Sequence, residues 1–126
     1  MKVKINDKII DAKLPKAFKK QWITALRSGK YLQGKRQLGN LKEGFCCIGL
    51  AGHLCNIPFS PEKQVLLSKK ETEFSETQYH VTNSKKIPKI LLGSNISNKL
   101  VSKLTEMNDS GKWSFKRIAS YVERYL

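Results

Sequence analysis

Hydrophobic and polar residues alternate along this chain in ways that predict an α+β fold. Residues 2–13 alternate Lys with Val or Ile on either side of a polar pair, which predicts a β-hairpin. Pro15 suits the first position of a helix, because its missing N–H group costs no hydrogen bond there. From residue 15 to residue 28 the apolar side chains recur three or four apart, which predicts an amphipathic helix ending before Gly29.

Three further helices follow from the same reasoning. Residues 45–54 are nearly all apolar or small, which predicts a buried helix stopped by the prolines that follow. Residues 96–107 carry one apolar stripe, and residues 114–126 carry another behind Ser114, a residue type that caps helix starts. A polar turn at 108–113 joins these last two helices.

The segment from residue 60 to residue 93 gives the weakest pattern. Residues 65–67 and 79–81 are short apolar runs that suggest an extra strand pair. No repeat and no domain boundary is visible, so residues 1–126 are expected to form one small α+β domain, with about four helices and the hairpin around one core. The side chains expected in that core are Trp22, Leu26, Cys47, Leu50, Leu104, Phe115, Ile118 and Val122.

The charge of the chain is strongly positive and unevenly spread. Its 24 Lys and Arg residues exceed its 10 Asp and Glu residues, giving +14. Residues 1–42 carry 12 basic and 2 acidic residues (+10), residues 43–84 carry 3 and 5 (−2), and residues 85–126 carry 9 and 3 (+6). Two basic ends favour an anionic partner: a nucleotide, a nucleic acid or an acidic protein surface. The alternative is an AT-rich genome, which inflates Lys without functional demand.

The sequence disfavours membrane proteins and enzymes. No apolar run approaches the roughly 18 residues of a membrane span. The Lys-rich start lacks the apolar stretch of a signal peptide, so we expect a cytoplasmic protein that makes no membrane contact. No nucleophile elbow, Walker loop or zinc-protease motif is present, and we therefore expect no catalysis and no cofactor. A homo-oligomer is one alternative that the sequence does not decide.

One short segment has the residue types of a zinc site but not its spacing: Cys46, Cys47, His53 and Cys55. Zinc sites take ligands from two separated groups, whereas these residues lie on one predicted helix, where neighbouring side chains point about 100° apart. Free cysteine is among the most buried residue types. We interpret all three cysteines as reduced core thiols and expect no metal.

Two polar segments are the candidates for binding a ligand. Residues 30–44 contain three glycines and four basic residues, so the backbone can approach a phosphate that the cations neutralise. The turn at 108–113 offers polar and aromatic side chains that suit a base or ribose. The alternatives are an ordinary surface loop and a connecting turn that caps the last helix. The expected phosphate ligands are Arg27, Lys30, Lys35 and Arg36, and the expected base ligands are Asn108, Asp109 and Trp113.

Three segments in fixed order, Trp22–Gln33, Phe45–Leu50 and Met107–Phe115, resemble a family of small bacteriophage proteins. Members have the pattern W, ALRSGxYxQ, FCCLGxLC and LNDxGxSFxxIAxxIE; this chain departs at Ile48 and Asn56. The resemblance implies a phage accessory protein, a class that often counters host defence. The +10 charge of residues 1–42 beside a glycine-rich loop leads us to expect that this protein binds a phosphorylated ligand, such as a nucleotide immune signal, without catalysis. The alternatives are an inhibitor docking its basic face on an acidic host protein, and a DNA- or RNA-binding protein.

Overall fold

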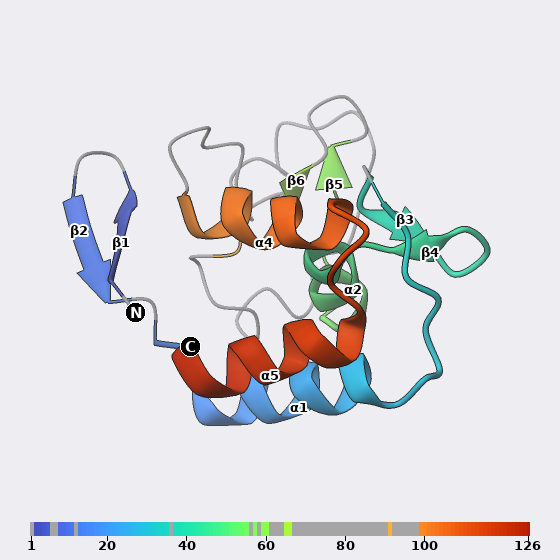
Figure 1. Cartoon of the computed structure of the whole chain (residues 1–126), viewed down its shortest axis with the longest axis horizontal. Helices are drawn as coiled ribbons and strands as arrows, with labels where there is room; N and C mark the ends of the chain where they lie inside the picture. The colour runs from blue at the N-terminus through green and yellow to red at the C-terminus, as the bar shows by residue number, and fades with distance from the viewer. Residues whose placement is uncertain are drawn as a thin grey trace.

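The structure of the chain is a computed structural model, and its helices and strands form an α+β arrangement (Figure 1). It describes residues 2–5, 8–11, 13–35, 37–55, 57, 59–60, 65–66, 91 and 99–126. The helices of this part are α1 (Lys16–Arg27), α2 (Cys47–Leu54), α4 (Lys99–Asp109) and α5 (Phe115–Tyr125). The antiparallel strand pairs are β1 (Lys2–Ile5) with β2 (Lys8–Asp11), β3 (Gly39–Asn40) with β4 (Gly44–Phe45), and β5 (Phe59–Ser60) with β6 (Val65–Leu66).

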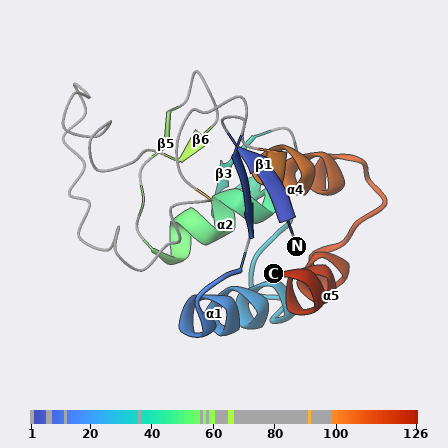
Figure 2. The same cartoon turned by 90° about the vertical axis from the view of Figure 1, so that its left-hand side faces the viewer.

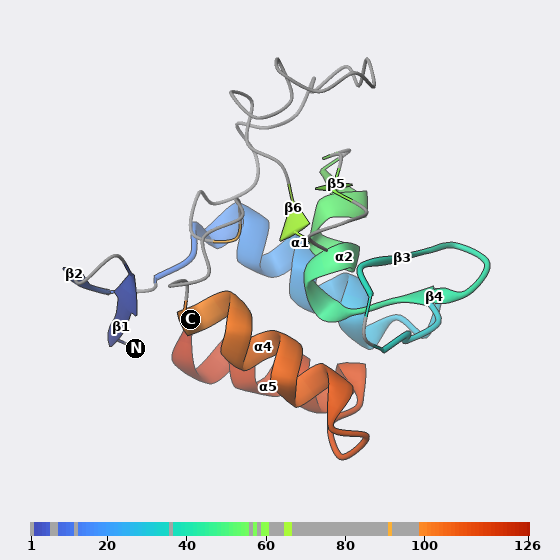
Figure 3. The ribbon, with the colours of Figure 1, turned by 90° about the horizontal axis from the view of Figure 1, so that it is seen from above.

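Helices α1 and α5 lie side by side and antiparallel, with α4 against α5 (Figures 1 and 3). The backbone joins the start of one helix to the end of the other, because the Leu14 N–H donates to the Leu126 carbonyl at 2.8 Å. Ser114 caps α5 as the sequence predicts: its side chain accepts a hydrogen bond from the Arg117 N–H. Both helices turn their apolar stripes inward.

Helix α2 fills the centre of the core and contacts α1, α4 and strands β3, β4 and β6 (Figure 2). Trp22 from α1 is fully buried, and its indole N–H donates to the Cys47 carbonyl at 3.1 Å, so the largest core side chain leaves no polar atom unpaired. Gly49 permits close packing, because a Cβ there would overlap the Leu38 carbonyl. The eight expected core side chains named above are all buried.

The structure confirms most of the expected elements and differs from the expectation at three points. The pairing of β1 with β2 confirms the hairpin predicted over residues 2–13. Residues 65–66 form a strand, but they pair with residues 59–60; residues 79–81, the expected partner, lie outside the described residues. The β3–β4 hairpin lies within the segment interpreted as a loop, because its glycines mask the strand pattern. Asn108 belongs to α4 and not to the turn after it.

Candidate anion-binding site

Backbone hydrogen bonds join the segment after α1, residues 30–35, to β4. We call this segment the glycine-containing loop. The Gly34 N–H donates to the Phe45 carbonyl at 2.7 Å, and the Phe45 N–H donates to the Leu32 carbonyl at 2.8 Å. These bonds fix residues 32–34 beside the start of α2. The loop therefore reaches the α4–α5 turn as an ordered strand-like segment.

Asn108 is the polar centre of this region and is fully buried. Its Nδ2 group donates to the Gly34 carbonyl at 2.8 Å and to Asp109 Oδ1 at 3.2 Å. Its Oδ1 accepts from Gln33 Nε2 at 3.0 Å and from the Cys47 N–H at 3.2 Å. An amide has two donors and two acceptor positions, so protein groups use all of them. The expectation that Asn108 binds a base is therefore corrected: it holds the loop, α2 and α4 together.

Gln33 completes the same network from the loop side. Its Nε2 group also donates to the Trp113 carbonyl at 2.8 Å, and its Oε1 accepts from the Phe115 N–H at 3.0 Å. The side chains of Gln33 and Asn108 thus tie four backbone segments together, and we call this pair the polar lock. It fixes the start of α5 relative to the glycine-containing loop, although Gln33 and Phe115 are 82 residues apart.

Outside the polar lock, the loop and the α4–α5 turn bring cations together. The Lys35 Nζ atom lies beside Gly111, since a Cβ added to that glycine would come within 3.2 Å of it. The Arg117 guanidinium lies over the Trp113 ring, 4.1 Å from its centroid, and donates to the Lys112 carbonyl at 3.3 Å. Lys35, Lys112 and Arg117 are all exposed. We call Lys35, Lys112, Trp113 and Arg117 the cationic corner.

The geometry of the corner suits a phosphate. Ring contact and one hydrogen bond hold the Arg117 guanidinium in place, and its other N–H groups have no partner among the described residues. A planar guanidinium held in this way loses little side-chain entropy when it binds a phosphate through two hydrogen bonds. The half-buried Trp113 offers the ring that the sequence assigned to a base. Asp109, half-buried beside the lock, accepts from Asn108.

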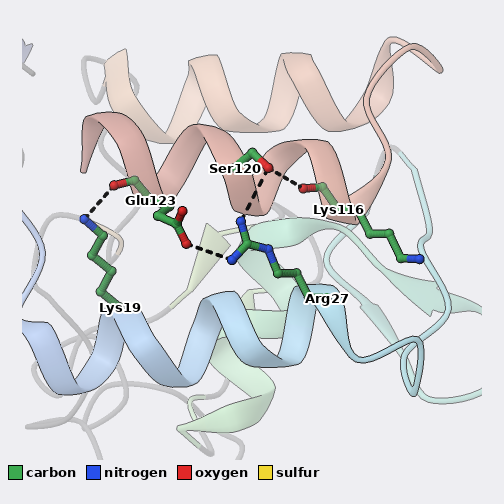
Figure 4. A network of polar contacts seen from close by, with 5 residues as sticks. All are labelled: Lys19, Arg27, Lys116, Ser120 and Glu123. Carbon is green, nitrogen blue, oxygen red and sulfur yellow. Dashed lines mark hydrogen bonds and ion pairs between the residues drawn. The ribbon is translucent and has the colours of Figure 1, made fainter.

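Arg27 and Lys30 lie elsewhere, at the last residue of α1 and just after it. Arg27 donates to the Glu123 carboxylate at 2.7 Å and to Ser120 Oγ at 3.4 Å, which ties α1 to α5 (Figure 4). Its hydrogen bond and charge hold the pKa of the Glu123 carboxyl below its usual value. Lys30 lines a shallow hollow of about 410 Å³ on α1, together with Lys20 and Tyr31. Arg36 lies outside the described residues.

The three cysteines are buried free thiols, as expected. Burial raises the pKa of Cys46 and raises that of Cys47 well above its usual value, so both stay protonated at neutral pH. The Cys47 thiol donates to the Leu104 carbonyl at 3.5 Å, and the Cys46 sulfur accepts from the Gly49 N–H at 3.3 Å, capping α2. In the part of the chain that the structure describes, no three metal-ligand side chains meet, and no helix is both long and apolar enough to cross a membrane.

Sequence reasoning missed Arg117 and Lys112 as parts of the site. Trp113 and Arg117 are four residues apart at the start of a predicted helix, a spacing that brings side chains onto one face and indicates a cation–ring pair. Lys112 follows Gly111, whose φ of +78° turns the chain. No comparable signal pointed to Lys35 beside Gly111, because those residues lie far apart in the sequence.

The fold and the corner define a small basic α+β protein with a buried amide lock beneath exposed cations. The chain belongs to the family described as Domain of unknown function (DUF8296), which matches residues 14–126. Searches of curated proteins and of solved structures gave no significant match.

Proposed function

We propose that this chain is a phage accessory protein of the bacterial cytoplasm that binds a phosphorylated ligand without transforming it. The ligand would be a nucleotide, such as a signal of host defence, or the backbone of a nucleic acid. The proposal rests chiefly on one observation: Arg117 lies over Trp113 with most of its N–H groups unpaired in the described part of the chain, beside Lys35 and Lys112. The resemblance to phage proteins supplies the biological setting.

The corner supports binding through preorganisation. Cations on flexible side chains lose conformational entropy when they bind, whereas a guanidinium stacked on a ring is already ordered. The lock beneath it fixes both the loop with Lys35 and the turn with Lys112. A nucleotide would place a phosphate between Arg117 and Lys35 and its base against Trp113.

The test is a thermal-shift and calorimetric screen of the whole chain against cyclic dinucleotides and trinucleotides, ADP-ribose derivatives and mononucleotides. A ligand at about 100 times its Kd stabilises the folded state by about 2.7 kcal/mol, which raises the Tm by several degrees. The corner variant K35Q/R117Q should lose that shift. The control K20Q/K30Q removes the same amount of charge from the hollow on α1. This control should keep the thermal shift.

Two results would overturn the proposal. Loss of binding in the α1 control, with binding kept in the corner variant, would move the site to the hollow that Lys30 lines. The absence of a shift with every nucleotide, and also with short DNA and RNA, would favour the competing function, an inhibitor that docks its basic face on an acidic protein. Recovery of the ligand chemically unchanged after incubation tests the claim that no reaction occurs.

A further inference from the structure

Beyond the corner, the surface of α5 continues as a row of rings and cations. Arg117, Tyr121 and Tyr125 recur every four residues, so they share one face of α5. Trp113, just before the helix, lies against the same face through its contacts with Arg117 and Tyr121. The ring centroids of Trp113 and Tyr121 are 6.0 Å apart, and those of Tyr121 and Tyr125 are 4.9 Å apart. The three rings therefore form one continuous contact series.

Each ring of this series carries a cation. Arg117 lies over Trp113, Lys103 Nζ from α4 lies 5.6 Å from the centroid of Tyr121, and the Arg124 guanidinium lies 5.3 Å from that of Tyr125. The three cations are exposed, and so is Tyr125, at 44%. We call these six residues the ring–cation row: Lys103, Trp113, Arg117, Tyr121, Arg124 and Tyr125.

A single cation–ring pair is an ordinary surface feature, but the charge along this row has one sign. Glu123 on α5 is paired with Arg27 on the side that faces α1. Glu106 on α4 lies three residues after Lys103. The surface thus offers flat rings together with excess positive charge.

The length of the row exceeds what a mononucleotide needs. Helix α5 has 11 residues, which span about 16 Å at 1.5 Å per residue. Stacked nucleotides repeat about every 3.4 Å along one strand, so the row matches about five of them. Proteins that bind single strands combine a basic track with rings on which bases stack.

We propose that the ligand is a single-stranded nucleic acid that runs from the cationic corner along the ring–cation row. This inference rests on the proposed function, because the corner holds the first phosphate of the strand. The bases lie against the rings and the Arg117 and Arg124 guanidinium planes, and Lys103 neutralises phosphate. An acidic peptide would satisfy the cations but would not stack on the rings, and a duplex keeps its bases inside.

The first experiment measures binding of oligothymidylates of about 1, 3, 6 and 12 nucleotides by tryptophan fluorescence. Trp22 is fully buried, whereas Trp113 is partly exposed, so quenching by bases reports on the row. We expect affinity to rise with length up to about six nucleotides and then to level off. A duplex of the same length and a polyglutamate of equal charge should bind more weakly and quench less.

The second experiment separates the row from charge in general. The row variant K103Q/R124Q should weaken binding of the longer oligonucleotides at least about fivefold. It should lower the salt slope by about 0.7, the contribution of the one single-strand phosphate contact that Lys103 makes. The variant Y125L, which keeps apolar bulk but removes the ring, should also weaken binding of the longer oligonucleotides. The control K20Q/K42Q removes two exposed lysines elsewhere and should leave the length dependence unchanged.

The outcomes distinguish this inference from the proposed function. If mononucleotides bind at the corner and longer strands bind no better, the row is overturned and the proposed function stands. Equal binding of polyglutamate or of the duplex, or equal losses in the K20Q/K42Q control, also overturns the row. If no phosphorylated probe binds, both fail. Length-dependent binding that the row variants reduce supports both.

Discussion

The polar lock and the cationic corner lie back to back, and the same two segments of the chain build both. Asn108 is fully buried and uses every hydrogen-bonding position of its amide, whereas Lys112, four residues later, is exposed. In the glycine-containing loop, Gln33 likewise belongs to the polar lock, whereas Lys35 is exposed. Polar residues in one motif thus have two roles, and burial decides which residue has which role.

The polar lock explains the polar character of Asn108, a residue that the sequence led us to expect in contact with a base. A buried polar network stabilises a structure only when each member has its partners, and Asn108 and Gln33 satisfy each other and four backbone groups. In the part of the chain that the structure describes, no buried side-chain nitrogen or oxygen lacks a partner. The lock therefore supports the exposed cations without contacting their ligand.

The largest effect should come from breaking the lock. Asn108→Ala leaves the buried Gly34 carbonyl and Cys47 N–H without partners, and we expect it to lower the free energy of unfolding by about 3 to 5 kcal/mol. Urea unfolding measures this loss. The matched control is Asn40→Ala: Asn40 also accepts two backbone hydrogen bonds, but it is exposed, so about 1 kcal/mol is expected. Equal losses would contradict the comparison.

A smaller effect should appear at alkaline pH, because the core beside the lock holds the Cys47 thiol protonated. Its pKa is raised in the folded state, so the unfolded chain loses this proton first. The free energy of unfolding should then fall as pH rises above about 8.5, the usual thiol value. Urea unfolding between about pH 7 and pH 10 checks this, and Cys47→Ala should show a shallower decline. Identical slopes would show that the thiol ionises equally in both states.

The smallest effect should come from the surface ion pair between α1 and α5. Arg27 lowers the pKa of Glu123, so the contribution of the pair is present at neutral pH and is lost as pH falls through that lowered pKa. Both side chains are largely exposed, and water and salt screen them. Arg27→Gln should therefore change the urea midpoint less than Asn40→Ala does, and about 0.5 M NaCl should remove the difference. A loss close to that of Asn108→Ala would place the pair among the main determinants of stability.

The local pattern of apolar residues was enough to predict the helices and the core. Apolar spacing located α1, α2 and α5 to within a few residues, and the expected core side chains are all buried. It also determined the Ser114 cap and the burial of the thiols. These features depend on local periodicity and on hydrophobic transfer, and both can be read from neighbouring residues.

Which polar residues point into the core depends on contacts between segments that are distant in the sequence. In the sequence, Asn108 and Lys112 are both polar residues near a turn. The Asn108 side chain is buried because it contacts Gly34 and Cys47, which lie more than 60 residues away in the sequence. The pairing of β3 with β4, and the place of Lys35 beside Gly111, also depend on contacts that periodicity does not encode. A polar side chain is equally suited to water and to a satisfied buried network, so its place is decided by partners that only the folded chain supplies.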